Sequence, residues 1–85
     1  MGELIQFPGT FPIKVMGANE ADFESLVLSI ILKHAPILGE DGVQARLSRG
    51  GRFISLTVRI TAESQAQLDA IYTELSAHER VLMML

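Results

Sequence analysis

The order of hydrophobic patterns along this chain predicts an α+β fold of the ferredoxin-like type, strand–helix–strand–strand–helix–strand (βαββαβ). Three observations support the prediction: apolar residues alternate in several short runs, two segments carry a helical apolar face, and a Gly-Gly pair separates two of the runs. Right-handed crossovers leave few other topologies for such an order. We therefore expect a four-stranded antiparallel sheet with both helices on one face.

The first strand is predicted in "TFPIKVM", residues 10–16, where Phe11, Ile13 and Val15 alternate with other residues. Such alternation is typical of a strand with one buried face. Pro12 has no N–H to donate, so one side of the strand's start should be unpaired or bulged.

Residues 1–9 are expected to form an N-terminal arm, because the turn-forming pair Pro8-Gly9 separates them from this strand. Residues 10–85 then form a single domain, as a chain of this length allows. The arm should pack its apolar side chains on the body; these are Leu4, Ile5 and Phe7.

The segment 18–36 is predicted to be the first helix, because its apolar residues recur at helical spacing. Asn19 is the expected N-cap. Lys33 and His34 should lie in the last turn, where the helix dipole favours positive charge, and Pro36 ends the helix. The predicted apolar face consists of Phe23, Leu26, Val27, Ile30 and Ile31.

A loop at 37–42 and a β-hairpin are predicted next. The hairpin consists of two alternating runs, 43–48 and 53–60. They are joined at Gly50 and Gly51, which can supply the positive φ that a tight turn needs. The residues expected on the helix side are Val43, Ala45, Leu47, Ile54, Leu56, Val58 and Ile60.

The second helix is predicted to begin at Thr61 or Ala62, with Thr61 or Ser64 as its cap. Its apolar face consists of Leu68, Ile71, Tyr72 and Leu75. The closing segment "HERVLMML" is predicted to be the last strand, with apolar residues on both faces.

Composition restricts the possible function. The chain has 85 residues, no cysteine and a net charge of −3, which excludes disulfides and Cys-based metal sites. The longest apolar run, 26–32, is far short of the ~20 residues that span a bilayer, and no signal peptide is evident. We expect a cytoplasmic protein that binds no membrane.

The segment "SRGGRFISLTVRI", residues 48–60, is similar at its start to the RNA-recognition octamer. However, Phe53 is the one outward aromatic in register, Gly51 stands where another is expected, and the first strand offers none. The acidic net charge also counts against nucleic acid as a partner. An RNA-binding module is therefore a second alternative, and the tip is interpreted as a turn.

No catalytic constellation, metal site or cofactor site is predicted. The two histidines, His34 and His78, lie on different elements, and neither has a second ligand at metal-binding spacing. His34 is best explained by the helix dipole, with a role in ligand binding or pH sensing as the alternative.

The open face of the sheet is the predicted binding surface, because basic and apolar residues share the outward parity of its strands. An anionic metabolite with an apolar part, such as an acyl carboxylate, would suit it. Alternatively, the arginines only offset nearby carboxylates. The candidate binding residues are Lys14, Met16, Arg46, Arg52, Phe53 and Arg59, together with His34; the last strand adds Leu82 and Met84, or else Val81, Met83 and Leu85.

Several short motifs, in their order and spacing, resemble the YbeD family of small bacterial proteins. They are "FP" at 7–8, "KVMG" at 14–17, "HAP" at 34–36, "SRGGRFIS" at 48–55 and "VLMML" at 81–85. The resemblance implies a fold like that of the ACT regulatory domains and a regulatory role linked to lipoate metabolism. It supplies no catalytic residues. Since ACT-like domains commonly pair, a homodimer is among the expected assemblies.

The leading hypothesis is a non-enzymatic regulatory or adaptor domain that binds a small anionic metabolite or a protein partner. The alternative is a small enzyme or an enzyme subunit. Fold analogy alone is weak evidence for function, so the two differ in what the structure should show: a covered or ligand-ready sheet face, or a deep cleft with convergent polar groups.

Overall fold

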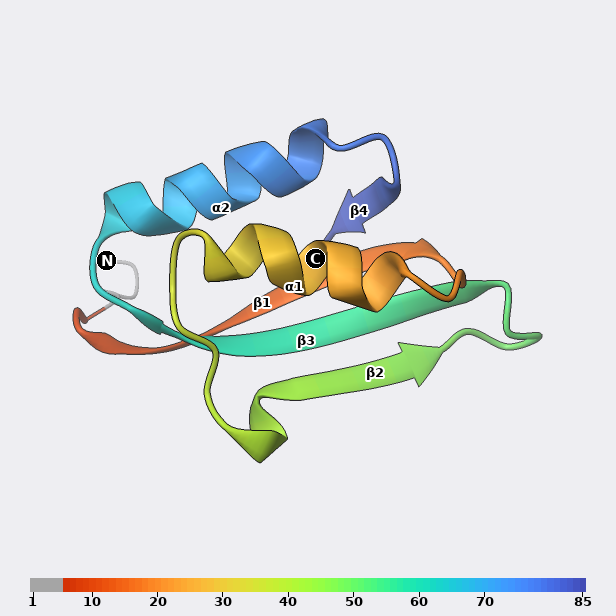
Figure 1. Ribbon diagram of the computed structural model, residues 1–85, viewed down its shortest axis with the longest axis horizontal. Helices are drawn as coiled ribbons and strands as arrows, with labels where there is room; N and C mark the ends of the chain where they lie inside the picture. Colours follow the sequence, from red (N-terminus) through yellow and green to blue (C-terminus); the bar gives the residue numbers. More distant parts are fainter. Residues whose placement is uncertain (1–5) are drawn as a thin grey trace, which may run out of the picture.

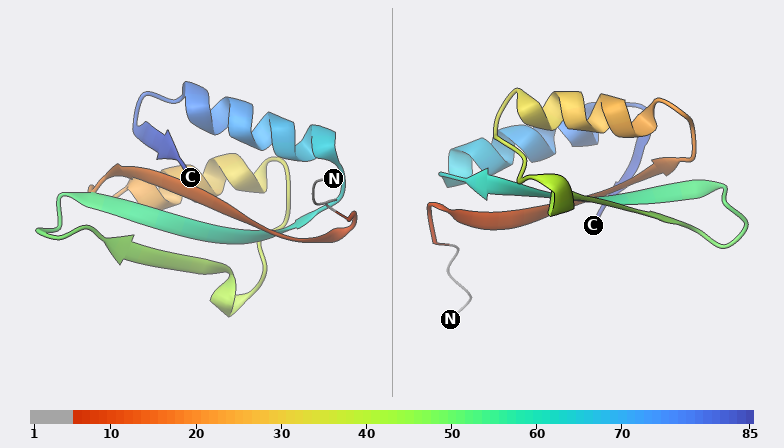
Figure 2. Two further views of the ribbon diagram at one scale, coloured as in Figure 1. Left: turned by 180° about the vertical axis from the view of Figure 1, so that it is seen from behind. Right: turned by 60° about the horizontal axis from the view of Figure 1, so that its bottom comes forward.

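The computed structural model describes residues 6–85, which form one four-stranded antiparallel sheet with two helices on one of its faces (Figures 1 and 2). The strand order across the sheet is β2-β3-β1-β4. This is the predicted ferredoxin-like βαββαβ fold. Its elements are β1 (Gly9–Ala18), α1 (Phe23–Leu32), a short 3-10 helix η1 (Glu40–Gly42), β2 (Val43–Leu47), β3 (Phe53–Ala62), α2 (Gln65–Ala77) and β4 (Val81–Met84).

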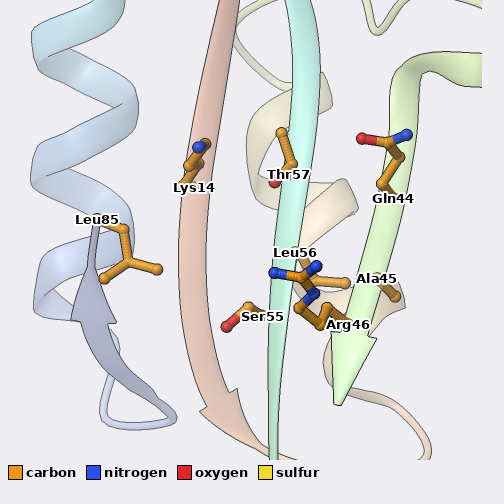
Figure 3. Close-up of a pocket in the computed structure, with 8 residues that line it drawn as sticks. All are labelled: Lys14, Gln44, Ala45, Arg46, Ser55, Leu56, Thr57 and Leu85. Atoms are coloured by element: carbon orange, nitrogen blue, oxygen red, sulfur yellow. The ribbon is translucent and has the colours of Figure 1, made fainter. Parts of the chain in front are cut away.

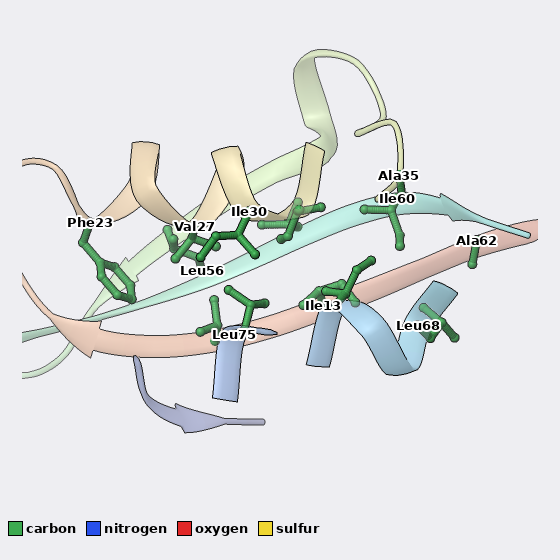
Figure 4. Close-up of a cluster of buried hydrophobic side chains, with 14 residues drawn as sticks. Ile13, Phe23, Val27, Ile30, Ala35, Leu56, Ile60, Ala62, Leu68 and Leu75 are labelled. Atoms are coloured by element: carbon green, nitrogen blue, oxygen red, sulfur yellow. The ribbon is translucent and has the colours of Figure 1, made fainter. Parts of the chain in front are cut away.

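The hydrophobic core lies between the sheet and the helices (Figure 4). The central strands β1 and β3 supply alternate residues to it, because successive side chains of a strand point to opposite faces. The alternation predicted these residues correctly. The fully buried members from the two strands are Ile13, Val15, Leu56, Val58 and Ile60, and the helices add Phe23, Val27, Ile31, Ile71 and Leu75.

Helix α1 is shorter than predicted, and the prediction of Asn19 as its N-cap is wrong. Asp22 occupies the N-cap position. The side-chain amide of Asn19 donates instead to the carbonyl of Gly51 at 2.9 Å, and its backbone N–H donates to the carbonyl of Arg52. Lys33 is the C-cap, so His34 lies just beyond the helix rather than in its last turn.

Helix α2 begins at Gln65, later than the predicted Thr61 or Ala62. Those two residues extend β3, where they pair with Thr10 and Gly9 of β1. Ser64 is the N-cap, as one of the two predicted alternatives had it, and its hydroxyl accepts a hydrogen bond from the Gln67 N–H at 3.1 Å.

The hairpin of β2 and β3 turns at Gly50 and Gly51, whose φ values of 87° and 75° confirm the predicted positive φ. Ala45 and Leu47 alternate with Gln44 and Arg46 along β2 as predicted, but both are exposed. In Figures 1 and 2 the helices lie mainly over the other strands, and of the helix-side residues of β2 Val43 packs against the core.

Pro12 lies opposite Arg59 of β3 and beyond the reach of β4, which pairs with β1 from Val15 to Gly17. One side of this start of β1 is therefore unpaired, as predicted. Phe7 of the arm packs against the core, whereas Leu4 and Ile5 lie outside the described residues.

The expected loop at 37–42 contains η1, and Ile37 forms an isolated bridge with Ile60. None of the helices in residues 6–85 is long and apolar enough to cross a membrane.

Candidate functional site

The register of the sheet places two cations on its open face, on either side of β3. Lys14 of β1 lies opposite Thr57, which lies opposite Gln44 of β2. In the next row on the same face, two residues along each strand, Ser55 lies between Met16 and Arg46. Lys14 and Arg46 are therefore diagonal neighbours across β3, and the hydroxyls of Ser55 and Thr57 lie between them.

These residues line a hollow of about 510 Å³ on the open face (Figure 3). Figure 3 shows the Arg46 side chain reaching from β2 toward β3. The volume falls in the ~300–1,000 Å³ range of ligand pockets in proteins, although this hollow is open on one side. Its lining contains no Asp or Glu side chain; the residues are Lys14, Gln44, Ala45, Arg46, Ser55, Leu56, Thr57 and Leu85.

The hollow has two cationic side chains, Lys14 and Arg46, and no ion pair with either of them is found among the described residues. Among the side chains that the structure describes, neither Lys14 nor Arg46 lies within 4.0 Å of a carboxylate oxygen. Arg80 differs, since its Nη2 lies 2.7 Å from oxygens of Glu20 and Asp22. The charges of the hollow are thus available to an anion.

The other predicted residues of the sheet face lie around the hollow rather than in its lining. Arg59 donates from Nη1 to Oε1 of Gln44 at 3.0 Å. The guanidinium of Arg52 lies 5.8 Å from the ring centroid of Phe53, at cation–π distance. Met16 shares the row of Ser55 and Arg46.

His34 lies apart from these residues, beside the helices. Its Nε2 is 2.9 Å from Oε1 of Glu74 on α2, and Lys33 also bonds this carboxylate. The hydrogen bonds from Lys33 and then His34 lower the pKa of Glu74 below its ordinary value. The structure therefore does not bring His34 together with the hollow.

The last strand contributes to the open face through Met83 and Leu85. Met83 pairs with Met16, and the backbone N–H of Leu85 donates to the Lys14 carbonyl at 2.9 Å. This supports the predicted alternative of Val81, Met83 and Leu85, except that Val81 packs against the core.

Gln44 was not among the predicted site residues, although its outward parity on β2 was a usable signal.

Comparison with known proteins identifies the family. The family model described as "Protein of unknown function (DUF493)" matches residues 2–85. A UPF0250 protein of Chromobacterium violaceum is 46% identical over 83 residues, which cover 98% of this chain and 93% of the relative. The chain belongs to this family. A UPF0250 protein of Leptothrix cholodnii is 44% identical, over 96% of this chain and 90% of the relative.

The resemblance to the YbeD proteins is thereby confirmed, since this is the YbeD/UPF0250 family. The solution structure of protein HP0495 from H. pylori aligns with a TM-score of 0.78, covering 99% of this chain and 88% of that one, at 16% identity. At that identity the likeness concerns the fold alone. The family carries no catalytic description, and within residues 6–85 no three His, Asp or Glu side chains gather as a metal site would require.

Proposed function

We propose that this protein is a non-enzymatic, cytoplasmic regulatory domain that binds a small anionic metabolite with an apolar part on the open face of its sheet. The observation that carries the proposal is the hollow between β1 and β2, in which Lys14 and Arg46 have no described carboxylate partner. A link to lipoate metabolism rests on the family resemblance alone.

The chemistry of the lining suits a carboxylate. The planar guanidinium of Arg46 can donate two parallel hydrogen bonds to the two oxygens of one carboxylate, and the Lys14 ammonium adds a second positive charge. The hydroxyls of Ser55 and Thr57 are further donors in the same lining.

Apolar contact is available on the β4 side of the hollow. Leu85 is part of the lining and is 55% exposed, and Met83 in the row of Met16 is 49% exposed. A short acyl chain laid from the cations toward β4 would cover these side chains and remove apolar surface from water. An acyl carboxylate therefore fits the site better than a polynucleotide, whose bases need stacking aromatics.

The test is a titration of ¹⁵N-labelled protein with hexanoate and octanoate, and separately with a single-stranded RNA. We expect the acids to shift the amides of 14–16, 44–46, 55–57 and Leu85, with octanoate binding more tightly. Arg46→Gln should weaken octanoate binding about tenfold, the effect of losing one charge-assisted hydrogen-bond pair.

The matched control is Arg49→Gln on the hairpin tip, which removes the same charge outside the hollow and should leave the affinity nearly unchanged. Equal losses in the two variants would show a nonspecific charge effect and contradict the proposal. RNA binding that weakens steeply with salt would favour the nucleic-acid alternative instead.

A further inference from the structure

A second feature of the molecule is the outer edge of β2, which shares Arg46 with the proposed ligand site but uses the backbone groups of the strand. In the strand order β2-β3-β1-β4, β2 is terminal and pairs with β3. An edge strand presents a row of backbone N–H and C=O groups to any extended chain that approaches it. Its side chains from Gln44 to Leu47 are all exposed.

The hydrogen-bond pattern identifies which backbone groups face outward. The Ser48 N–H donates to the Phe53 carbonyl at 2.9 Å. Because bonded and non-bonded pairs alternate in an antiparallel ladder, Arg46 and Gln44 also direct their backbone groups toward β3. Ala45 and Leu47 therefore direct theirs to the free edge.

This edge lacks two of the devices that block strand pairing, a proline and a bulge. β2 contains no proline and pairs with β3 without a shift in register from Val43 to Leu47. The opposite edge strand, β4, is shorter and has a register shift at Met16/Gly17. Regular edges of this kind are used for strand addition by peptide-binding domains.

The side chains of β2 indicate the chemistry of the partner. Arg46 points to the open face, near a hairpin that also carries Arg49 and Arg52, while Leu47 points to the helix side and is 54% exposed. A strand added beside β2 would place alternate side chains next to these two surfaces.

We propose that the β2 edge binds an extended segment of a partner protein by strand addition, with acidic side chains next to Arg46 and apolar side chains next to Leu47. A second copy of this chain fits less well. Antiparallel pairing of two β2 strands would bring two Arg46 side chains to the same face of the joint sheet, where like charges repel.

The probe is a capped synthetic peptide of alternating valine and glutamate, added to ¹⁵N-labelled protein. We expect shifts at the amides of 43–48 and protection of the Ala45 and Leu47 amides from hydrogen exchange. A peptide of alternating valine and lysine should bind at least ten times more weakly, because it places positive charges beside Arg46.

The Leu47 N–H faces outward, and edge strands tolerate proline at such positions. Leu47→Pro therefore removes an outward N–H without removing a hydrogen bond to β3. It should weaken peptide binding at least tenfold, while Leu47→Ala, which keeps the N–H, should weaken it less. Leu47 does not line the hollow. Both variants should therefore bind octanoate like the unmodified protein, which would show that they are folded.

Two results would overturn the proposal. One is full-strength peptide binding to Leu47→Pro, or none to the unmodified protein. The other is a dimer in sedimentation that Leu47→Pro converts to a monomer, because a second copy would then occupy the edge.

Discussion

The guanidinium of Arg80 holds the carboxylate of Asp22 with two hydrogen bonds, Nη2 to Oδ1 at 2.7 Å and Nη1 to Oδ2 at 3.1 Å. Asp22 is the N-cap residue of α1, and Arg80 directly precedes β4. The pair therefore ties the start of the first helix to the start of the last strand. The hydrogen bonds from Arg80 lower the pKa of Asp22 and raise that of Arg80.

Replacing Arg80 by lysine should lower the midpoint of urea unfolding, because an ammonium keeps the charge but cannot form the bidentate hydrogen bonds of a guanidinium. Asp22→Asn should lower it less, since an amide oxygen still accepts one bond. A double-mutant cycle of the two positions measures their coupling. Arg49→Lys at the exposed tip is the matched control; an Arg80→Lys midpoint equal to that of the control would contradict the prediction.

The faces of the core strands and helices are tested by Ile30→Ala and Leu56→Ala. Both side chains are buried, so each truncation should cost ~2–5 kcal/mol through lost transfer free energy and the cavity left behind. Leu32→Ala on α1 is the control, because Leu32 is 58% exposed and its loss should stay within ~0.5 kcal/mol. Urea unfolding measures all three, and losses below about 1 kcal/mol at both buried sites would contradict the assignment.

Element type and buried face were predictable because they depend on local periodicity, as in β1 and β3. Element ends were not, because tertiary contacts set them. Asn19 has the right chemistry for an N-cap, yet its amide bonds the hairpin carbonyl of Gly51, which lies 32 residues away. Likewise, β1 supplies pairing partners that keep Thr61 and Ala62 in β3 rather than in α2.

The candidate site was likewise predictable only where local periodicity determines it. Strand parity placed Lys14 and Arg46 on one face, but their separation by β3 depends on the register between strands distant in sequence. The position of β4 depends on the irregularity at Gly17, where a Cβ would come within 2.4 Å of the Phe23 ring. The partner of His34 follows from how α1 and α2 pack, which no local pattern encodes.

The hairpin tip depends on two glycines with left-handed backbone conformations. Space is available around Gly50 and Gly51, so a substitution there acts through backbone strain rather than through a clash. Replacing both by valine should cost about 1–2 kcal/mol per residue or shift the strand register. Thermal unfolding monitors stability, and the β2–β3 cross-strand NOEs monitor register.

Arg49→Val is the matched control for the tip, because among the described residues no non-glycine has positive φ. It should melt close to the parent protein. If the doubly substituted tip also melts like the parent, with its cross-strand NOEs unchanged, the tip does not constrain the hairpin.

The contact of Glu74 with Lys33 and His34 makes part of the stability depend on pH. These hydrogen bonds lower the pKa of Glu74 below 4.5 in the folded protein. The folded state therefore favours the ionised carboxylate, so its stabilising effect is fully present above pH 4.5 and is lost as pH falls through the lowered pKa. Glu74→Gln should be less stable than the parent at neutral pH, and the difference should shrink in acid.

Urea unfolding from neutral pH down through this range measures the effect. Glu79→Gln is the control for removing a carboxylate, because Glu79 is exposed and forms no ion pair within the part of the chain that the structure describes. It should keep the acid-dependent slope of the parent. Lys33→Gln should reproduce part of the Glu74→Gln effect, since the Lys33 hydrogen bond is the largest cause of the lowered pKa. A Glu74→Gln profile parallel to that of the parent would show that the contact does not stabilise the fold.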